Sequence, residues 1–363
     1  MDAKVAIIGA GWYGCHLGMM LDAMGCNVSI FEKNSDILGE ASGNNQFRLH
    51  LGFHYARHNR TRIQSRDGYA RFTERYPTLS KPIENNLYVV PKFDSLVDFD
   101  TYRLIMFSSG IHFQELRPNE WPSYLKDVDG VLKVDEHVLL IEKAREHFKQ
   151  KLAGKIRLNT KVECAEQQGN AALVNGEKFD FVIDATWGHL SDIDYDCFYE
   201  PTLLLYYRYK GKGEYPAITM VDGPLCSIYP TEKEGVYTLS SVKHTPLGKY
   251  DTSEEAKQRL RDFTDSELKI KIAEMEAHVK SFVPDFCEHF EFDSPQFNIK
   301  TKLLGEHDDR SCYVKTDDRM ISVFSGKIDT IFFAAQKVCD YLERYVHGEI
   351  TPQELAKNKQ GHV

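Results

Sequence analysis

The sequence predicts a two-domain protein that combines an α/β Rossmann-like domain with an α+β domain whose sheet is mainly antiparallel. Two observations support this prediction. Residues 5–32 read as strand, glycine-rich turn, helix and strand, and residues 200–300 hold several short strands bounded by turns. The 363 residues are long enough for two domains, each with its own core. We expect both to be discontinuous, the first comprising residues 1–80, 136–199 and 300–363 and the second comprising residues 81–135 and 200–299.

The opening stretch has the pattern of a dinucleotide-binding site. An apolar run ends just before Gly9, and Gly11 and Gly14 follow at the start of an amphipathic helix. In such a turn the glycines permit a sharp bend, the close approach of a pyrophosphate and the close packing of helix on strand. Glu32 ends the second strand about 20 residues later, where an acidic side chain binds a ribose hydroxyl. The motif by itself leaves FAD and NAD open.

Composition excludes several classes of function. A net charge of −9 argues against a general nucleic-acid binder, which needs a basic surface. Neither a signal peptide nor an apolar run of membrane-spanning length is visible, so we expect a cytoplasmic enzyme with a small-molecule substrate and no membrane partner. The eight cysteines form no C-x-x-C pair, which argues against a zinc site, and we expect no bound metal.

A loop rich in glycine and asparagine follows the second strand and ends in His50, Gly52 and Tyr55. This segment resembles one in the D-amino-acid oxidase family of FAD-dependent oxidoreductases, where a small-residue loop ends in a pattern like His-x-Gly-x-x-Tyr. The resemblance implies that the loop runs under the pyrophosphate and along the flavin ring. Arg48 lies inside this loop, where we expect it to meet an anionic substrate or a phosphate.

The arginines that follow are expected on the solvated face of a helix. This helix is predicted to begin near Asn59 and to end before Pro77, with Phe72 and Tyr76 facing inward. The arginines concerned are residues 57, 60, 62, 66, 71 and 75.

The middle of the first domain is predicted to differ from a nicotinamide dehydrogenase, which repeats strand–helix units in a row. A helix is expected to begin at Val134, followed by strands within residues 155–164 and a hairpin closed by Asn175-Gly176. The next strand, Phe181–Asp184, runs into Ala185-Thr-Trp-Gly188. This order resembles the FAD domain of the same family, except that Trp187 makes the last turn bulkier.

The second domain and the C-terminal segment complete the resemblance. Residues 203–242 contain four predicted strands, and residues 252–282 contain amphipathic helices. The run Ser325-Gly-Lys-Ile-Asp-Thr330 resembles the closing Ser-Gly-x-Gly segment of the family but lacks the second glycine. A helix is predicted directly after it, with its N-terminus facing the flavin pyrimidine.

The resemblance implies an FAD cofactor bound by the first domain, with the second domain as substrate or cap domain. The residues expected to bind FAD are Gly9, Gly11, Tyr13, Gly14, Glu32, Lys33, Ser42, Asn44, Asn45, Arg48, Leu49, His50, Val162, Ala185, Thr186, Trp187, Gly188, Gly326, Lys327, Ile328 and Asp329.

The resemblance also implies a reaction, the transfer of a hydride from a carbon bearing an amine or hydroxyl group to flavin N5. His244 resembles a His-Thr step of amine-oxidising relatives, and Ser240 and Ser241 stand where such oxidases place a lysine. A dehydrogenase with another electron acceptor therefore stays open, as does covalent attachment of the flavin through His50. The candidate substrate-side residues are Arg48, His50, His54, Tyr229, His244 and Lys327.

Two other classes of function stay open at this point. A flavoenzyme similar to UDP-galactopyranose mutase shares the opening motif, and the arginines would suit a nucleotide-sugar diphosphate. A flavin-binding relative without turnover is the second, because Trp187 and Asp329 depart from the family pattern.

Overall fold

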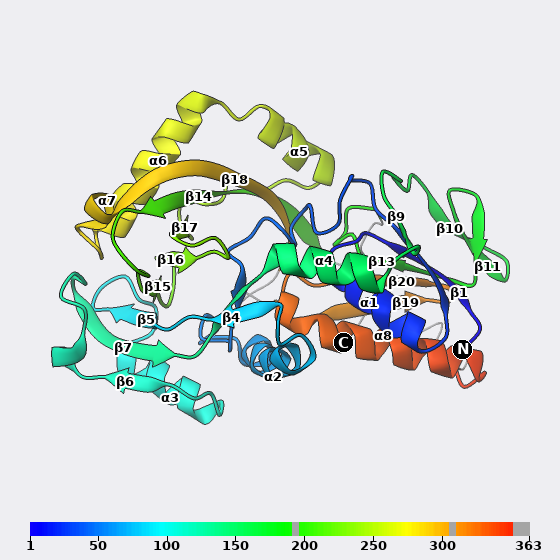
Figure 1. Ribbon diagram of the computed structural model, residues 1–363, viewed down its shortest axis with the longest axis horizontal. Coiled ribbons are helices and arrows are strands. Elements are labelled where there is room, and N and C mark those ends of the chain that lie inside the picture. Colours follow the sequence, from blue (N-terminus) through cyan, green and yellow to red (C-terminus); the bar gives the residue numbers. More distant parts are fainter. Residues whose placement is uncertain (191–195, 305–309, 351–363) are drawn as a thin grey trace.

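Two sheets form the centres of the molecule in the computed structural model, which describes residues 1–190, 196–304 and 310–350. One sheet has six strands and the other has eight, and they lie in the right and left halves of Figure 1. A smaller three-stranded sheet connects the two halves.

The six-stranded sheet has the order β19-β20-β13-β1-β2-β9, with β1 in the interior. Pairing is parallel except between β19 and β20, which form an antiparallel pair at one edge. This order puts the carboxyl ends of β1, β2 and β13 side by side, which is where doubly wound sheets bind ligands. The strands are β1 (Lys4–Ile8), β2 (Asn27–Phe31), β9 (Ile156–Arg157), β13 (Phe181–Asp184), β19 (Tyr313–Asp317) and β20 (Met320–Phe324).

Both faces of this sheet are covered. Helices α1 (Trp12–Ala23) and α8 (Ile331–Val346) lie against one face, and a sheet of three antiparallel strands packs on the other (Figure 1). The helix α4 (Ile141–Lys151) buries Ala144 and Phe148 in the same core as α1. The three strands are β10 (Ala165–Gln168), β11 (Ala171–Val174) and β12 (Glu177–Phe179).

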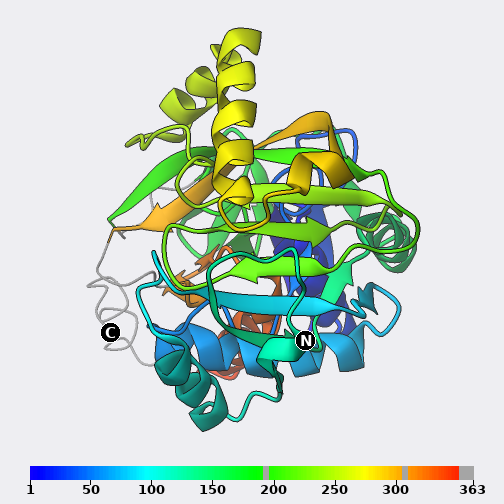
Figure 2. The same ribbon diagram turned by 90° about the vertical axis from the view of Figure 1, so that its left-hand side faces the viewer.

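The eight-stranded sheet is antiparallel apart from the parallel pair β5–β15, and Figure 2 shows its strands one below another. Its order is β18-β14-β17-β16-β15-β5-β7-β6, and β14 and β18 pair along almost their whole length. The strands are β5 (Asn86–Pro91), β6 (Gln114–Leu116), β7 (Val128–Val134), β14 (Cys197–Tyr209), β15 (Ala217–Met220), β16 (Cys226–Pro230), β17 (Val236–Ser241) and β18 (Phe290–Leu303).

One face of this sheet packs on helices, and the other faces the first domain. Met275 and Val279 of α6 join Ile218 and Ile228 of the sheet in one apolar core. Strand alternation turns the neighbouring side chains, such as Tyr229, to the opposite face. Further helices are α3 (Phe99–Ser108), α5 (Ser253–Arg261), α6 (Asp265–Lys280) and α7 (Phe286–His289), with short 3-10 turns η1 (Pro118–Glu120) and η2 (Ile328–Thr330). None of the helices in the described ranges combines the length and apolar composition needed to cross a bilayer.

The small connecting sheet places the loop after β2 between the two halves. Strand β8 (His137–Leu139) pairs on one side with β3 (Arg48–Leu49) and on the other with β4 (Ser80–Pro82). Helix α2 (Asn59–Arg75) follows β3 and packs against η2 and α8. The connecting sheet therefore fixes Arg48 at the junction of the two halves.

Several sequence predictions are confirmed and others are wrong, among them the solvated position expected for Arg62, which is buried in α2. The Asn175-Gly176 hairpin joins β11 to β12, and α8 buries the predicted face. The helix expected at Val134 begins only at Ile141, because the preceding residues pair as β7 and β8. Within residues 155–164 only Ile156 and Arg157 form a strand, which pairs with Ile30 and Phe31 at the end of β2.

The contact between α2 and η2 yields a test of packing. A Cβ atom on Gly68 of α2 would stand 1.8 Å from the carbonyl oxygen of Asp329. We expect Gly68→Ala to destabilise the flavin-free protein by about 1–3 kcal/mol, because the helix and η2 must separate. Urea unfolding measures this, with Gly39→Ala as control, since a Cβ there would meet its nearest atom at 3.5 Å. Equal midpoints for the two variants would contradict the close packing.

Candidate functional site

The turn between β1 and α1 is built from backbone approaches that leave no room for side chains. A Cβ on Gly14 would lie 1.8 Å from the carbonyl oxygen of Gly9, so only glycine lets the helix start this close to the strand. Gly9 itself has a φ of +96°. A Cβ on Gly11 would stand 2.8 Å from Ser42 Oγ, and this residue offers the helix no side-chain cap. The turn thus exposes backbone N–H groups at a helix N-terminus, and such groups can bind a pyrophosphate.

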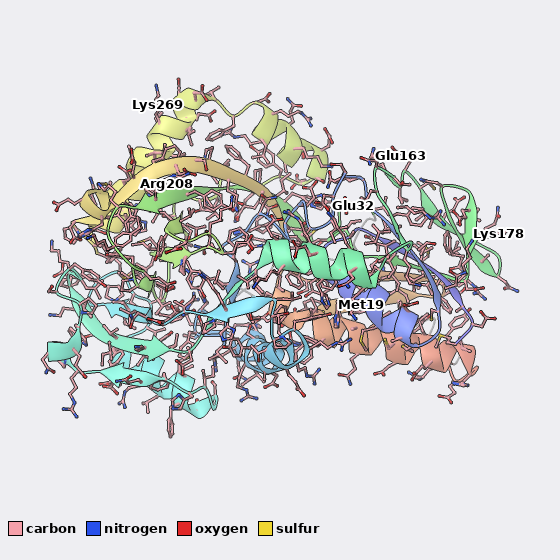
Figure 3. All side chains as sticks on the ribbon, viewed as in Figure 1. Met19, Glu32, Glu163, Lys178, Arg208 and Lys269 are labelled. Carbon is pink, nitrogen blue, oxygen red and sulfur yellow. The ribbon has the colours of Figure 1, made fainter. Side chains whose placement is uncertain are left out.

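Glu32 closes the turn from the end of β2. Its Oε2 accepts a hydrogen bond from Ala10 N at 2.9 Å, and its Oε1 accepts one from Asn34 N at 2.9 Å. The side chain lies within the body of the molecule, in contrast to Lys178 at its edge (Figure 3). A carboxylate has about four lone-pair sites, so two acceptor sites remain for ribose hydroxyls.

The asparagine-rich loop is held by its own side chains. Ser42 Oγ accepts a hydrogen bond from Trp12 N, the first amide of α1. The side-chain amides of Asn44 and Asn45 donate to carbonyl oxygens of residues 39–42. Of this loop's predicted ligand residues, Ser42 lies at the turn, whereas the two asparagine amides shape the loop itself.

The end of β13 closes the site on the other side of β1. The carbonyl oxygen of Ala185 lies beside Gly9, and Thr186 hydrogen-bonds to the carboxylate of Asp184. Trp187 has a φ of +58° and lies against Gly326, where a Cβ would meet the indole at 2.5 Å. The turn and the Ser-Gly-Lys segment are therefore in direct contact. The indole Nε1 is buried and makes no hydrogen bond within the described ranges.

Tyr13 joins the N-terminal turn to the C-terminal segment. Its hydroxyl donates to the carbonyl oxygen of Lys327 at 2.6 Å and lies 2.7 Å from Thr330 Oγ1. Burial raises the pKa of this phenol well above its ordinary value. The hydroxyl thus stays protonated and fixes η2 and the start of α8 beside α1.

Arg48 has hydrogen-bonding capacity that the protein does not use. Its Nη1 donates to Thr219 Oγ1 at 2.7 Å, and its guanidinium carbon lies 3.7 Å from the centroid of the Tyr229 ring. Nε and Nη2 are buried and have no hydrogen-bond partner in the described part of the chain. Unpaired buried donors are costly, so this geometry suits an anionic ligand that accepts from both nitrogens.

Lys327 and His50 form a buried pair beside Arg48. Lys327 Nζ lies 2.8 Å from His50 Nε2, 3.7 Å from Asp329 Oδ2 and 4.1 Å from the centroid of the Tyr55 ring. His50 Nδ1 lies 3.2 Å from Gly52 N, so each ring nitrogen has a polar neighbour within the protein. Burial, and then Lys327, holds the pKa of His50 well below its usual range, so this ring is neutral.

A second buried chain of polar groups was not predicted from the sequence as a unit. His54 Nδ1 lies 2.8 Å from the hydroxyl of Tyr88, which donates to Glu136 Oε2 at 3.0 Å. Glu136 also accepts from Leu51 N and from Asn86 Nδ2. Glu136 was missed because its segment was expected to be helical. The available signal was alternation like that of a strand, which places Glu136 on the same face as the apolar residues Leu132, Val134 and Val138.

His244 lies away from these residues. Its Nδ1 lies 3.3 Å from Oε2 of Glu274 in α6. Helix α6 packs on the face of the eight-stranded sheet opposite to the one that carries Tyr229. Lys33 forms an exposed ion pair with Glu40, and Val162 packs in the core beneath β11. Other predicted residues point into the core, namely Leu49, which is fully buried, and Ile328, which is partly buried. The structure therefore brings Arg48, His50, Tyr229 and Lys327 together and leaves His244 outside.

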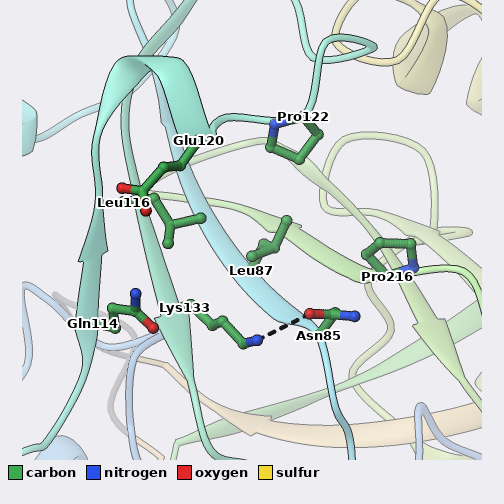
Figure 4. A pocket seen from close by; sticks show the side chains of 8 residues that line it. All are labelled: Asn85, Leu87, Gln114, Leu116, Glu120, Pro122, Lys133 and Pro216. Atoms are coloured by element: carbon green, nitrogen blue, oxygen red, sulfur yellow. Dashed lines mark hydrogen bonds between the residues drawn. The ribbon is translucent and has the colours of Figure 1, made fainter.

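A pocket of about 270 Å³ lies elsewhere, on the outer side of β5, β6 and β7 (Figure 4). It is lined by Leu87 and Leu116 and crossed by a hydrogen bond from Lys133 Nζ to Asn85. None of its lining residues belongs to the clusters around Arg48 or Glu32, so it is not the site described above.

The parallel sheet, the three-glycine turn and Glu32 define a dinucleotide-binding protein of the Rossmann type. The family model described as FAD dependent oxidoreductase (DAO) matches residues 4–294, and the chain belongs to this family. It is an FAD-dependent oxidoreductase, and the prediction of FAD over NAD is confirmed.

Relatives in fungi match along almost the whole chain. "FAD-dependent monooxygenase FPY4" of Fusarium mangiferae is 50% identical over 340 residues, which cover 94% of this chain and 91% of that protein. "FAD-dependent monooxygenase kojA" of Aspergillus flavus is 27% identical over 92% of this chain and 84% of that protein.

Solved structures share the fold. Glycine oxidase from Geobacillus kaustophilus superimposes with a TM-score of 0.72 at 15% identity, covering 94% of this chain and 95% of that chain. Dithionite-reduced L-α-glycerophosphate oxidase from Mycoplasma pneumoniae, with FAD bound, gives the same TM-score, identity and coverage. The predicted combination of a Rossmann-like domain and a second α+β domain is thereby confirmed.

Glu32 gives a direct test of the cofactor site. Replacing it with Ala removes the acceptor expected for the ribose hydroxyls, and a charged hydrogen bond contributes about 1.5–3 kcal/mol. We therefore expect FAD to dissociate roughly 10- to 100-fold more readily. Titrating the flavin-free protein with FAD while following flavin fluorescence measures this. Glu163→Ala, an exposed acid on the surface, is the control, and equal affinities of the two variants would count against the assignment.

Proposed function

We propose that this protein oxidises an anionic amine or 2-hydroxy acid, with Arg48 binding the anionic group. The observation that supports this most is the guanidinium with two buried, unpaired nitrogens beside Thr219 and Tyr229. A carboxylate can accept from two nitrogens of arginine at once. Bound FAD supplies the electron acceptor, which takes a hydride from the carbon bearing the amine or hydroxyl group.

The charges around Arg48 also favour an anion. Burial, and then Arg48 and Lys327, lower the pKa of His54, and these two cations make the field at the ring positive. The acids nearby offset this only in part, because burial raises the pKa of Asp329 and raises that of Glu136 to about 7. A substrate that brings a negative charge therefore fits the interior better than a neutral one.

Oxygen insertion is the second candidate, because two relatives are named monooxygenases. The two reactions differ in what they require. Dehydrogenation of an amine or hydroxy acid reduces the flavin without oxygen, whereas a monooxygenase substrate takes up one oxygen atom from O₂. The other two classes fit less well, since membership of an oxidoreductase family argues against a mutase and against a partner without turnover.

Anaerobic mixing distinguishes these reactions. We add amino acids, 2-hydroxy acids and UDP-sugars separately to the flavin-loaded protein without oxygen and follow flavin absorbance. Bleaching by an amine or hydroxy acid supports the proposal. A substrate that leaves the flavin oxidised but gains ¹⁸O from labelled O₂ in the presence of a reductant supports oxygen insertion instead.

The role of Arg48 has a mutational test. With any substrate that bleaches the flavin, Arg48→Gln should raise the half-saturating concentration roughly 10- to 100-fold, because a charged hydrogen-bond pair is lost. The control is Arg60→Gln, which removes an exposed arginine whose guanidinium lies 5.5 Å from the centroid of the Tyr313 ring. Unchanged saturation in Arg48→Gln would place the anionic group elsewhere.

A further inference from the structure

The oxidation proposed above requires the substrate to lose a proton as well as a hydride. The O–H or N–H bond breaks and releases the proton to the protein, the C–H bond gives up its electron pair with the hydride, and a C=O or C=N bond forms. The proton therefore needs an acceptor close to Arg48.

His54 is the histidine in this cluster that has a ring nitrogen available. Each nitrogen of His50 has a polar neighbour within the protein, Gly52 N beside Nδ1 and Lys327 Nζ beside Nε2. His54 uses only Nδ1, which lies 2.8 Å from the Tyr88 hydroxyl, and no hydrogen bond reaches its Nε2 from the described residues. Its ring centroid lies 5.1 Å from that of His50, which places it at the same buried centre.

We propose that Nε2 of His54 takes up the proton that the substrate loses, and that Glu136 and Tyr88 are positioning residues that decide which nitrogen of His54 is protonated beforehand. This inference rests on the proposed oxidation of an amine or 2-hydroxy acid. It adds to that reaction a proton acceptor, His54, and the two residues that set its tautomer.

The hydrogen-bond directions support this assignment. When Glu136 is ionised, its Oε2 accepts the Tyr88 proton at 3.0 Å, so the phenol oxygen can only accept from His54. The ring proton then sits on Nδ1, and Nε2 is left with a free lone pair. When Glu136 is protonated, Tyr88 can turn its proton toward Nδ1, and the ring proton moves to Nε2, where it blocks uptake.

The surroundings place this switch in an accessible pH range. Burial raises the pKa of Glu136 to about 7, although the Leu51 amide and Arg48 oppose this. The other ionisable groups that face Glu136 are Tyr69, Tyr88, Tyr102 and Tyr229. Those that face His54 are Arg48, Lys327, His50, Tyr55 and Tyr88.

An anionic substrate would make His54 a better acceptor. Burial, Arg48 and Lys327 hold the pKa of His54 well below its ordinary value, so the ring is neutral before substrate binds. A negative group on Arg48 offsets one of these charges and raises the proton affinity of Nε2. Binding and proton uptake are thereby linked through the same arginine.

The test reads the tautomer directly. We label the histidines with ¹⁵N in the flavin-loaded protein, assign His54 with a His54→Gln variant, and record long-range ¹H–¹⁵N spectra. Well above pH 7 we expect the proton on Nδ1, and well below pH 7 on Nε2. If wild-type His54 keeps one tautomer across this range, the inference is wrong, whatever the variants do.

Variants of the two positioning residues sharpen the result. In Glu136→Gln the amide can donate to Tyr88, and Asn86 Oδ1, which is buried and unpaired, can accept from it after a flip of the Asn86 side chain. We expect His54 to carry its proton on Nε2 at every pH. Tyr88→Phe should abolish the change near pH 7. Tyr69→Phe is the control, since that hydroxyl donates to the neighbouring Asp135 carbonyl and should leave the switch intact.

Kinetics distinguish this inference from the proposed function. With a substrate that bleaches the flavin, the rate of anaerobic reduction should rise through about pH 7 as Glu136 ionises. Glu136→Gln should lose this rise and react roughly 10²- to 10⁴-fold more slowly, the usual effect of losing general-base catalysis. Bleaching with an unchanged pH profile would overturn the relay alone. If no amine or hydroxy acid bleaches the flavin, the proposed function fails while the tautomer result still stands.

Discussion

The structure depends on the close backbone contact at the turn between β1 and α1. Because Gly14 and Gly9 approach each other, α1 starts directly above β1, and three other segments can reach the same turn. Glu32 binds it from β2, Ser42 from the following loop, and the hydroxyl of Tyr13 reaches the C-terminal segment. A side chain at Gly14 would push α1 away from β1 and so separate these partners, which makes the cofactor site and its connection to Lys327 depend on this one close contact.

The elements that could be predicted from the sequence are those that depend only on residues close together in the chain. The glycine turn, the Asn-Gly hairpin and α8 each follow from a short pattern, and the structure has all three. The strand pairing of β8 with β3 and β4 joins residues far apart, so the periodicity around Glu136 was misread as a helix. For the same reason the face occupied by His244 could not be derived, since it depends on the register of β17.

The site contains charges of both signs that do not fully pair. Arg48 and Lys327 are cationic, whereas the two nearby acids are buried so deeply that their pKa values rise. The protein as a whole has a net charge of −9, so the positive charge around Arg48 and Lys327 is opposite in sign to that of the whole chain. Two neutral histidines lie between these groups, and their hydrogen-bond partners differ, which is why adjacent rings are assigned different tasks.

The contact between Tyr13 and Lys327 joins residues separated by more than three hundred positions. Until residues 320–346 have left the ribosome, β20 and α8 cannot complete the sheet and the site. A partly synthesised chain therefore has the phosphate-binding turn but lacks the lysine and the helix that enclose the reacting end. The enclosed site can therefore form only after almost the whole chain has been synthesised.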